Sequence, residues 1–228
     1  MPPLNRVPLA MPNRVAAVND ALTVSLDDPG DLVVAPPVLL GMGVALLLNA
    51  ALGSDGYATL ISGLTAALKV PFWTVNIAVG FGLIAMAWVR GTRPGAGTIL
   101  QPVIVGVTIS VALQFLPTQA SYLIRFAELG AALVIVSFGV AGYLSSDLGA
   151  GPTEAAALAL DPPIAFKWSY TVVQVSGALI GFALGAAIGP GTLLVALFVG
   201  PSVAWMQGTL FGRHARTNTD APMPPHPK

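Results

Sequence analysis

The sequence predicts an all-α membrane protein of six transmembrane helices and two short re-entrant half-helices, arranged as two inverted repeats of three spans each. Three observations support this fold class: little charge, apolar stretches of membrane length, and an internal repeat. The 228 residues are 55% hydrophobic and 9% charged, whereas a soluble domain carries about 25% charged residues. Residues 168–212 contain no Asp, Glu, Lys or Arg, and a segment of that length cannot lie on a water-facing surface. We therefore expect lipid to be the main solvent of the folded chain.

Six apolar stretches have the length that a helix needs to cross about 30 Å of hydrocarbon at about 1.5 Å per residue. Prolines near their ends or at bends are tolerated in such helices. The six expected spans are Val33–Leu52, Val70–Val89, Ile99–Leu116, Phe126–Ser146, Trp168–Ile188 and Thr192–Phe211.

Two further segments, Tyr57–Leu68 and Thr153–Leu160, are too short to cross the membrane, because as helices they would be about 18 Å and about 12 Å long. Each follows a glycine cluster, and glycine permits the tight turn and close backbone approach that a re-entrant segment needs. We interpret them as re-entrant half-helices whose N-termini point to the bilayer centre. The alternative is a pair of amphipathic helices that lie flat at the interfaces.

An internal repeat divides the chain. An offset of 96 residues aligns Gly53 with Gly149, and an offset of 94 aligns the Gly-x-Gly-Thr turn at 95–98 with that at 189–192. Three crossings per repeat is an odd number, so the second repeat must enter from the opposite side, as in many secondary transporters. The predicted regions are a polar cytoplasmic N-terminal arm (1–32), a first membrane repeat (33–117), a second membrane repeat (118–212) and a disordered cytoplasmic C-terminal tail (213–228).

The distribution of basic residues sets the orientation. With both termini in the cytoplasm, eight of the ten Lys and Arg residues are cytoplasmic, and Lys69 and Arg125 lie outside, in agreement with the positive-inside rule. An eight-span arrangement gives the same balance, but it requires Thr153–Leu160 to cross the membrane. The sequence therefore predicts a multi-pass protein with both termini cytoplasmic.

Composition excludes several function classes. The chain has no cysteine, and its two histidines, His214 and His226, lie in the polar tail, which leaves no thiol chemistry and no Cys- or His-based metal site in the body. The sequence shows no paired aspartates and no Ser–His pair, so we expect neither an enzyme nor a cofactor. The net charge of zero gives no reason to expect nucleic acid as a partner. Membrane lipid and an unidentified small molecule are the expected partners.

The candidate substrate-binding site lies where the half-helices begin and where the second span of each repeat carries polar side chains. A helix N-terminus presents unpaired N–H groups and a partial positive charge, which suit a carboxylate, phosphate or carbonyl group of a cargo. The candidate residues are Ser54, Asp55, Gly56, Asn76, Gly151, Pro152, Thr153, Glu154, Tyr170 and Gln174.

The polar residues of this set have alternative roles. At membrane depth, Asp55 and Glu154 would be costly and therefore functional, as proton or cation sites. In the first turn of a helix they could instead face water and interact with the macrodipole. Asn76, Tyr170 and Gln174 either hydrogen-bond between helices or line a cavity.

Glycines on the fifth span predict close helix packing. Gly177, Gly181 and Gly185 recur every four residues and form a ridge that another helix can approach closely. Packing against the other repeat is the first interpretation, and a homodimer contact is the second. The threonines of the two Gly-x-Gly-Thr turns, Thr98 and Thr192, are expected to cap the helices that follow.

Several motifs, in order, resemble the YczE/YyaS/YitT-like family of bacterial integral membrane proteins. They are Leu-Gly-Ala-Gly-Pro at 148–152, Gly-Pro-Gly-Thr-Leu-Leu-Val-Ala-Leu-Phe-Val-Gly-Pro at 189–201 and Arg-Pro-Gly-Ala-Gly-Thr at 93–98. The resemblance covers about residues 35–212, and it implies small-molecule transport across the bacterial cytoplasmic (inner) membrane. At 153–154 the chain has Thr-Glu where the family tends to have Arg-Asp. Tyr170 and Gln174 stand where the family often has Arg and Glu, which implies a different cargo or a lost activity.

These features predict a small-molecule membrane transporter, an exporter or a facilitator, with a mid-membrane site between inverted repeats. The alternative is a non-transporting membrane scaffold or an accessory subunit of a larger complex. A polar cavity between the repeats at mid-membrane distinguishes the two.

Overall fold

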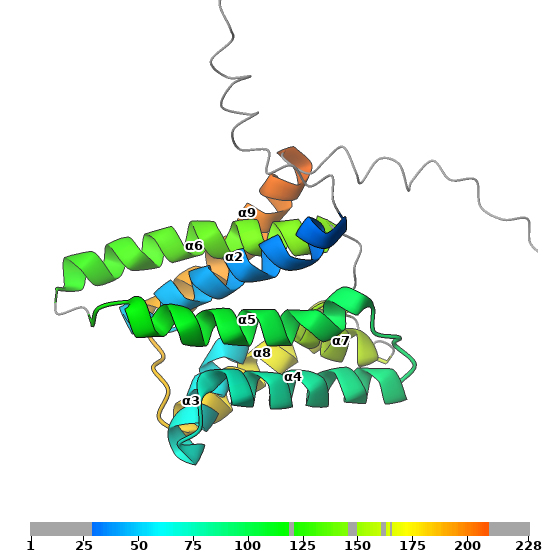
Figure 1. Cartoon of the computed structure of the whole chain (residues 1–228). Helices are drawn as coiled ribbons and strands as arrows, with labels where there is room; N and C mark the ends of the chain where they lie inside the picture. Colours follow the sequence, from blue (N-terminus) through cyan, green and yellow to red (C-terminus); the bar gives the residue numbers. More distant parts are fainter. Residues whose placement is uncertain (1–28, 119–120, 146–149, 161–162, 165, 210–228) are drawn as a thin grey trace, which may run out of the picture.

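The computed structural model of the protein describes residues 29–118, 121–145, 150–160, 163–164 and 166–209. All regular elements among these residues are α-helices, as Figure 1 shows, which confirms the predicted helical class. The helices are α2 (Pro29–Ala50), α3 (Gly56–Leu68), α4 (Phe72–Val89), α5 (Ala96–Phe115), α6 (Tyr122–Ser145), α7 (Pro152–Ala159), α8 (Phe166–Ala183) and α9 (Pro190–Thr209). The predicted C-terminal tail and the arm up to residue 28 lie outside the described residues.

Four helices, α4, α5, α6 and α9, are long and apolar enough to cross a membrane. They occupy the second, third, fourth and sixth predicted spans. The helix α2 is apolar over Val34–Ala50, and α8 occupies the fifth predicted span. Large apolar side chains cover the outer surface, and Val89, Phe115 and Leu123 are at least 80% exposed. Such a surface suits lipid rather than water, so the chain is a multi-pass membrane protein.

Several helices begin earlier than predicted. The helix α2 begins at Pro29, within the predicted N-terminal arm, and proline suits a first helical position, where an N–H group is not needed. The N-cap of α5 is Gly95, without a side-chain capping bond, so Thr98 lies inside the first turn. The helix α9 begins at Pro190, which places Thr192 inside its first turn as well. The prediction that these two threonines cap the helices is wrong, because both helices start before them.

The helices follow the same order in both halves of the chain: long, short, long, long for α2–α5, and again for α6–α9. Contacts between helices follow the same pattern. The short helix α3 packs on α8 and the short helix α7 packs on α4, while α2 packs on α5 and α6 packs on α9. The first helices of the two halves, α2 and α6, pack on each other. Each short helix therefore contacts the third helix of the other half.

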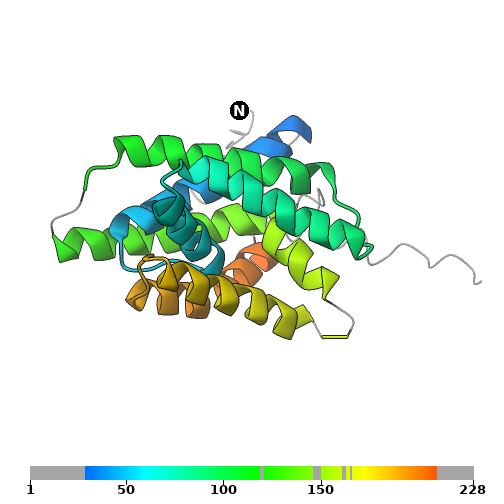
Figure 2. The same cartoon turned by 90° about the horizontal axis from the view of Figure 1, so that it is seen from below.

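The two short helices lie toward opposite ends of α4, as Figures 1 and 2 show from two directions. The helix α3 packs near the start of α4, where Ile61 joins Phe72 in a buried cluster. The helix α7 packs near the end of α4, where Ala155 and Ala159 contact Ala87.

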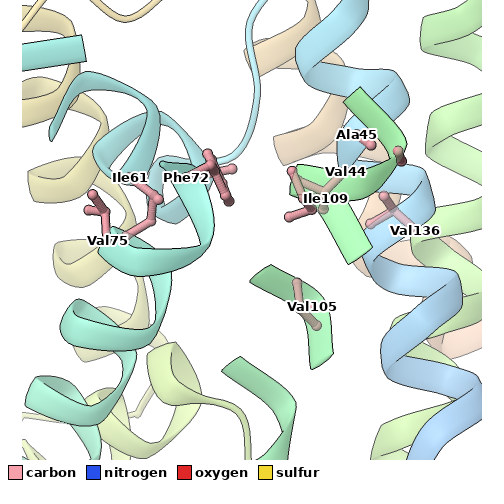
Figure 3. Close-up of a cluster of buried hydrophobic side chains, with 10 residues drawn as sticks. Val44, Ala45, Ile61, Phe72, Val75, Val105, Ile109 and Val136 are labelled. Atoms are coloured by element: carbon pink, nitrogen blue, oxygen red, sulfur yellow. The ribbon is translucent and has the colours of Figure 1, made fainter. Parts of the chain in front are cut away.

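The largest buried apolar cluster joins the first half to α6. One member from each of five consecutive helices illustrates it: Val44, Ile61, Val75, Ile109 and Val136. Figure 3 shows these side chains between the ribbons of α2 to α6. Burial of each such side chain contributes about 1.5–3 kcal/mol in water, and close packing takes over this role where lipid surrounds the helices.

Glycine allows α3 and α8 to approach each other. An added Cβ on Gly177 would lie 2.7 Å from the carbonyl oxygen of Gly56, and one on Gly181 would collide with the carbonyl oxygen of Thr59. These glycines pack the two halves together, which was the first interpretation of the ridge, and they are already covered within one chain. Gly185 lies beyond the end of α8 with φ of +94°, so it belongs to a turn and not to the ridge. A homodimer contact through Gly177, Gly181 and Gly185 remains a prediction. Of the three glycines, only Gly185 has no described atom within 4 Å of an added Cβ.

Candidate functional site

The turn between α2 and α3 places an acid at the start of the first short helix. Asp55 is the N-cap of α3, and its carboxylate accepts hydrogen bonds from the backbone N–H groups of Tyr57 (3.2 Å) and Ala58 (3.3 Å). Ser54 is buried, and its hydroxyl oxygen lies 2.9 Å from that of Thr59. Asp55 therefore closes the N-terminus of α3.

Two polar side chains of α8 lie beside this turn. The Oε1 atom of Gln174 accepts a hydrogen bond from the N–H group of Tyr57 (3.1 Å), and its Nε2 atom donates to the hydroxyl of Tyr170 (2.9 Å). The two α8 residues are four apart and therefore share one helix face. Gly56 permits this approach, because an added Cβ would collide with the backbone of Gln174. The packing of α3 on α8 thus brings Gln174 to the start of α3.

The second short helix contributes the other acid. Glu154 lies in the first turn of α7, and its carboxylate accepts hydrogen bonds from the hydroxyls of Tyr143 (2.8 Å) and Thr153 (3.0 Å). Tyr143 belongs to α6 and is buried. Thr153 is also a side-chain hydrogen-bond neighbour of Tyr170 on α8. The first turn of α7 is therefore tied to both α6 and α8.

These contacts form one polar cluster that joins the starts of the two short helices. The hydrogen bonds lead from Asp55 across α8 to Glu154, and the two acids are close enough to interact electrostatically. The residues that form it, which we call the polar cluster, are Asp55, Tyr57, Tyr143, Thr153, Glu154, Tyr170 and Gln174. Residues from α3, α6, α7 and α8 therefore meet at one place between otherwise apolar helices.

Gly151 lies at one corner of the polar cluster. We call Gly151 and the two side chains that face it, Gln101 and Glu154, the Gly151 corner. Gly151 is the N-cap of α7, and an added Cβ would lie 2.6 Å from both Glu154 Oε2 and Gln101 Oε1. Gln101 belongs to α5 and is 8% exposed. Its Oε1 atom is buried and has no hydrogen-bond partner among the described residues. An unpaired acceptor of the first half therefore faces the acid of the second.

Two of the predicted site residues have other roles. Asn76 is buried, and its Nδ2 atom donates a hydrogen bond to the carbonyl oxygen of Pro102 (2.6 Å). This bond ties α4 to α5, which is the interhelical role considered for Asn76 above. The backbone carbonyl of Asn76 accepts a hydrogen bond from the hydroxyl of Tyr57 (3.2 Å), so Asn76 lies at the edge of the polar cluster. Pro152 starts α7, where its fixed φ suits the helix, and it offers no donor to a ligand.

Three N–H groups near the start of α3 are already bonded. Tyr57 N–H is shared between Asp55 and Gln174, Ala58 N–H bonds to the Asp55 carboxylate, and Thr59 N–H bonds to the Asp55 carbonyl oxygen. A cargo carboxylate or phosphate would have to displace Asp55. An anionic cargo at this N-terminus therefore stays a prediction, one that has to compete with the acid at the N-cap, which already supplies a negative group there.

A small pocket lies beside the Gly151 corner. It measures about 20 Å³, which is room for about one water molecule. Two of its lining residues, Thr98 and Ala155, are close in the sequence to the residues of the corner: Thr98 is three residues before Gln101, and Ala155 directly follows Glu154. The lining residues are Ile84, Ala87, Thr92, Arg93, Pro94, Thr98, Ala150 and Ala155.

The Gly-x-Gly-Thr turns pack against the short-helix turns of the opposite half. The N–H group of Gly191 donates to the carbonyl oxygen of Leu52 (2.8 Å). Gly53 has φ of +103°, and an added Cβ would collide with Thr192. Thr98 of the first such turn lines the pocket beside α7. The second turn therefore holds the segment that leads into α3, and the first shares a pocket lining with Ala150 and Ala155 beside the start of α7.

Two residues of this site were not predicted. Tyr143 and Gln101 are polar side chains within apolar spans, which is the same signal that singled out Asn76. Applying that rule to every span identifies them as candidates. No local signal shows that they meet Glu154, because that contact depends on how α5, α6 and α7 are rotated against one another.

Comparison with known sequences adds a family and two relatives. Residues 32–208 match the family model described as a family of unknown function, DUF6198. An uncharacterized protein of Haemophilus influenzae is 25% identical over 169 residues, which cover 72% of this chain and 77% of that protein. The uncharacterized membrane protein YczE of Bacillus subtilis is 27% identical over 172 residues, which cover 72% of this chain and 78% of that protein. No solved structure matches the chain.

Proposed function

The chain belongs to the DUF6198 family and is YczE-like, and on this basis we propose that it transports small molecules across the bacterial cytoplasmic membrane. The binding site in this proposal is the polar cluster with the Gly151 corner, placed at mid-membrane between two inverted repeats. The observation that supports it most is the hydrogen-bonded connection between the starts of α3 and α7, with an acid at each end.

An acidic cluster is costly inside a membrane protein. Intramembrane Asp and Glu residues are rare and usually belong to a substrate or ion pathway. Simple helix association needs only small residues and single interhelical hydrogen bonds, which this chain already has in Gly177, Gly181 and Asn76. The two carboxyl groups therefore call for a function beyond assembly.

The inverted architecture belongs to the same proposal. Six spans and two re-entrant half-helices place three crossings in each half, with both termini cytoplasmic. The equivalent contacts of α3 with α8 and of α7 with α4 support this arrangement, as do the positions of the short helices at opposite ends of α4. Half-helices that enter from opposite sides then meet at their N-termini, a geometry that recurs in transporters with broken helices.

A non-transporting scaffold or accessory subunit is the second candidate. The polar groups of the cluster bond largely to one another, and the neighbouring pocket holds about one water molecule. A cluster that only locks the two halves together would have these features as well. Transport, in contrast, requires the halves to separate at the Gly151 corner so that a cargo can enter. Neither candidate involves an enzymatic reaction or a cofactor.

Flux measurements separate the two candidates. The full chain is reconstituted in liposomes, and the uptake of labelled organic cations, anions and neutral solutes is measured. We expect uptake of at least one class, and Gly151→Ala should reduce it at least about tenfold because the new methyl group fills the corner between Glu154 and Gln101. Gly130→Ala is the matched control, since an added Cβ there meets no described atom within 4 Å. Absence of flux for every class would favour the scaffold.

Cysteine labelling tests the topology. The chain contains no cysteine, so single substitutions report without background. Thr92→Cys and Thr118→Cys should react with a membrane-impermeant reagent from opposite sides, with Thr118→Cys labelled from outside. Labelling of both from one side would refute the inverted arrangement.

A further inference from the structure

We propose that the cargo of this site is a small organic cation with N–H donors, namely a primary or secondary ammonium compound. This inference rests on the transport function proposed above and adds the chemical class of the substrate. Four features of the polar cluster and the Gly151 corner lead to it: the acids, the bonded helix N-terminus, the unpaired acceptor Gln101 and the tyrosines.

The charged groups of the polar cluster are both acidic. The carboxylate of Asp55 accepts hydrogen bonds from two backbone N–H groups, and that of Glu154 accepts them from two hydroxyls. All of these donors are neutral. Among the described residues, neither acid forms an ion pair with Lys or Arg. A cationic ligand supplies the missing counter-charge, whereas an anionic ligand would add a third negative group to the same region.

The start of α3 also offers few unbonded donors to an anionic ligand. The N–H groups of Tyr57 and Ala58 already bond to Asp55, and that of Tyr57 is shared with Gln174. The start of α7 carries Pro152, which has no N–H group, at its first position. The usual reason for anion binding at helix N-termini, a set of unpaired N–H groups, is therefore weakened at both helices.

The unpaired oxygen of Gln101 is an independent sign of a ligand with donors. Gln101 is 8% exposed, and its Oε1 atom has no hydrogen-bond partner among the described residues. It lies 2.6 Å from the point where a Cβ of Gly151 would stand, and Glu154 Oε2 lies 2.6 Å from that same point. An unpaired buried acceptor costs about 1–3 kcal/mol. One ammonium group has two or three N–H donors and can bond to both oxygen atoms.

Tyrosines belong to the same cluster as the acids: the hydroxyl of Tyr143 bonds to Glu154 (2.8 Å), and that of Tyr170 accepts from Gln174 (2.9 Å). The chain has four tyrosines, and three of them, Tyr57, Tyr143 and Tyr170, interact electrostatically with Glu154. Tyr57 and Tyr170 also interact with Asp55. Aromatic rings attract cations through their negative faces, and this attraction is strongest where water is excluded. Acids together with aromatic rings favour an organic cation over a bare metal ion.

Equilibrium binding to the full chain in lipid nanodiscs tests this inference without relying on transport. The probes share a 2-phenylethyl group and differ in its polar substituent: 2-phenylethylammonium, its N,N,N-trimethyl analogue, 3-phenylpropionate and 2-phenylethanol. We expect 2-phenylethylammonium to bind at least about tenfold more tightly than the anion and the alcohol. The trimethyl analogue lacks N–H donors and should bind more weakly than the parent cation, because it cannot satisfy Gln101 Oε1 and Glu154 Oε2.

Matched variants locate the site. Glu154→Gln should weaken binding of 2-phenylethylammonium at least about tenfold. Gln101→Leu should remove the preference for the parent cation over its trimethyl analogue. Glu128→Gln is the control for loss of one acid, because Glu128 bonds to Asn49 and lies outside the polar cluster. Thermal unfolding of each variant shows whether it is folded.

The outcomes distinguish the two proposals. Tighter binding of 3-phenylpropionate would overturn the cation preference and leave transport standing. An equal loss of affinity in Glu128→Gln and Glu154→Gln would overturn the location of the site. If the folded chain binds none of the four probes but moves another solute in liposomes, the cargo class is wrong while the transport function holds. If it neither binds nor moves any solute, both proposals fail.

Discussion

Replacing Gly56 with alanine tests how closely α3 must approach α8. The new methyl group would collide with the carbonyl oxygen of Gln174, and it would also lie 2.6 Å from the carbonyl carbon and 2.8 Å from the Cα atom of that residue. All three are backbone atoms of a helix, so no side-chain rotation can relieve the contact. The two helices must therefore move apart, which lengthens the 3.1 Å hydrogen bond from Tyr57 N–H to Gln174 Oε1.

The loss of stability follows from these two effects. Overpacking at a rigid contact costs about 1–3 kcal/mol, and the weakened hydrogen bond adds about 1 kcal/mol. We therefore expect Gly56→Ala to lower the free energy of unfolding by about 2–4 kcal/mol. Gly82→Ala is the matched control. Gly82 lies within α4, an added Cβ there meets no described atom within 4 Å, and alanine in a helix interior is about 0.5–1 kcal/mol more stable than glycine.

Titration of the purified chain in mixed micelles with sodium dodecyl sulfate, followed by tryptophan fluorescence, measures both variants. Gly56→Ala should unfold at lower detergent fraction than the wild type, and Gly82→Ala at an equal or higher fraction. Stability of Gly56→Ala within about 0.5 kcal/mol of the wild type would refute the close contact of α3 with α8. The placement of Gln174 at the start of α3 would then be wrong as well.

Three further substitutions test single contacts by the same titration. Asn76→Leu should destabilise the chain by about 1–2 kcal/mol, because it leaves the buried carbonyl of Pro102 without its donor; an unchanged midpoint would contradict this bond. Arg125→Gln should cost about 1–2 kcal/mol through loss of the 2.6 Å hydrogen bond to the Ala50 carbonyl at the end of α2, and a stability equal to that of the wild type would show that water replaces it. Thr192→Val should instead stabilise by about 1 kcal/mol, since the buried threonine hydroxyl has no partner among the described residues; destabilisation would mean that the hydroxyl is bonded.

Local sequence patterns predicted the helices well. Hydropathy over about 20 residues marks a span because each residue adds a fixed rise to the helix. For the same reason the short segments were recognised by length, and α3 begins one residue before the predicted Tyr57. Helix starts were less accurate, since Pro29 and Pro190 begin helices, and Gly95 caps one, that hydropathy alone places later.

The candidate site was predicted in part. The acids Asp55 and Glu154 and the α8 residues Tyr170 and Gln174 were singled out because polar groups are costly between apolar helices, and the structure places all four in the polar cluster. The expected anion preference at α3 stays a prediction, and the hydrogen bonds of Asp55 to the N–H groups of Tyr57 and Ala58 count against it. Those bonds come from a carboxylate that folds back onto its own helix, and the sequence left open whether the acid would do so or face water.

Composition, hydropathy and the repeated glycine turns predicted a membrane chain of long and short helices in two similar halves, because these properties can be read from the residues of each segment. Only the tertiary structure decided that Gln101 of α5 and Tyr143 of α6 face Glu154 of α7. Those contacts depend on how each helix is rotated about its axis. Rotation is set by close packing between distant segments, as at Gly56 and Gly177, and an almost uniformly apolar helix in lipid has no polar face that would reveal it.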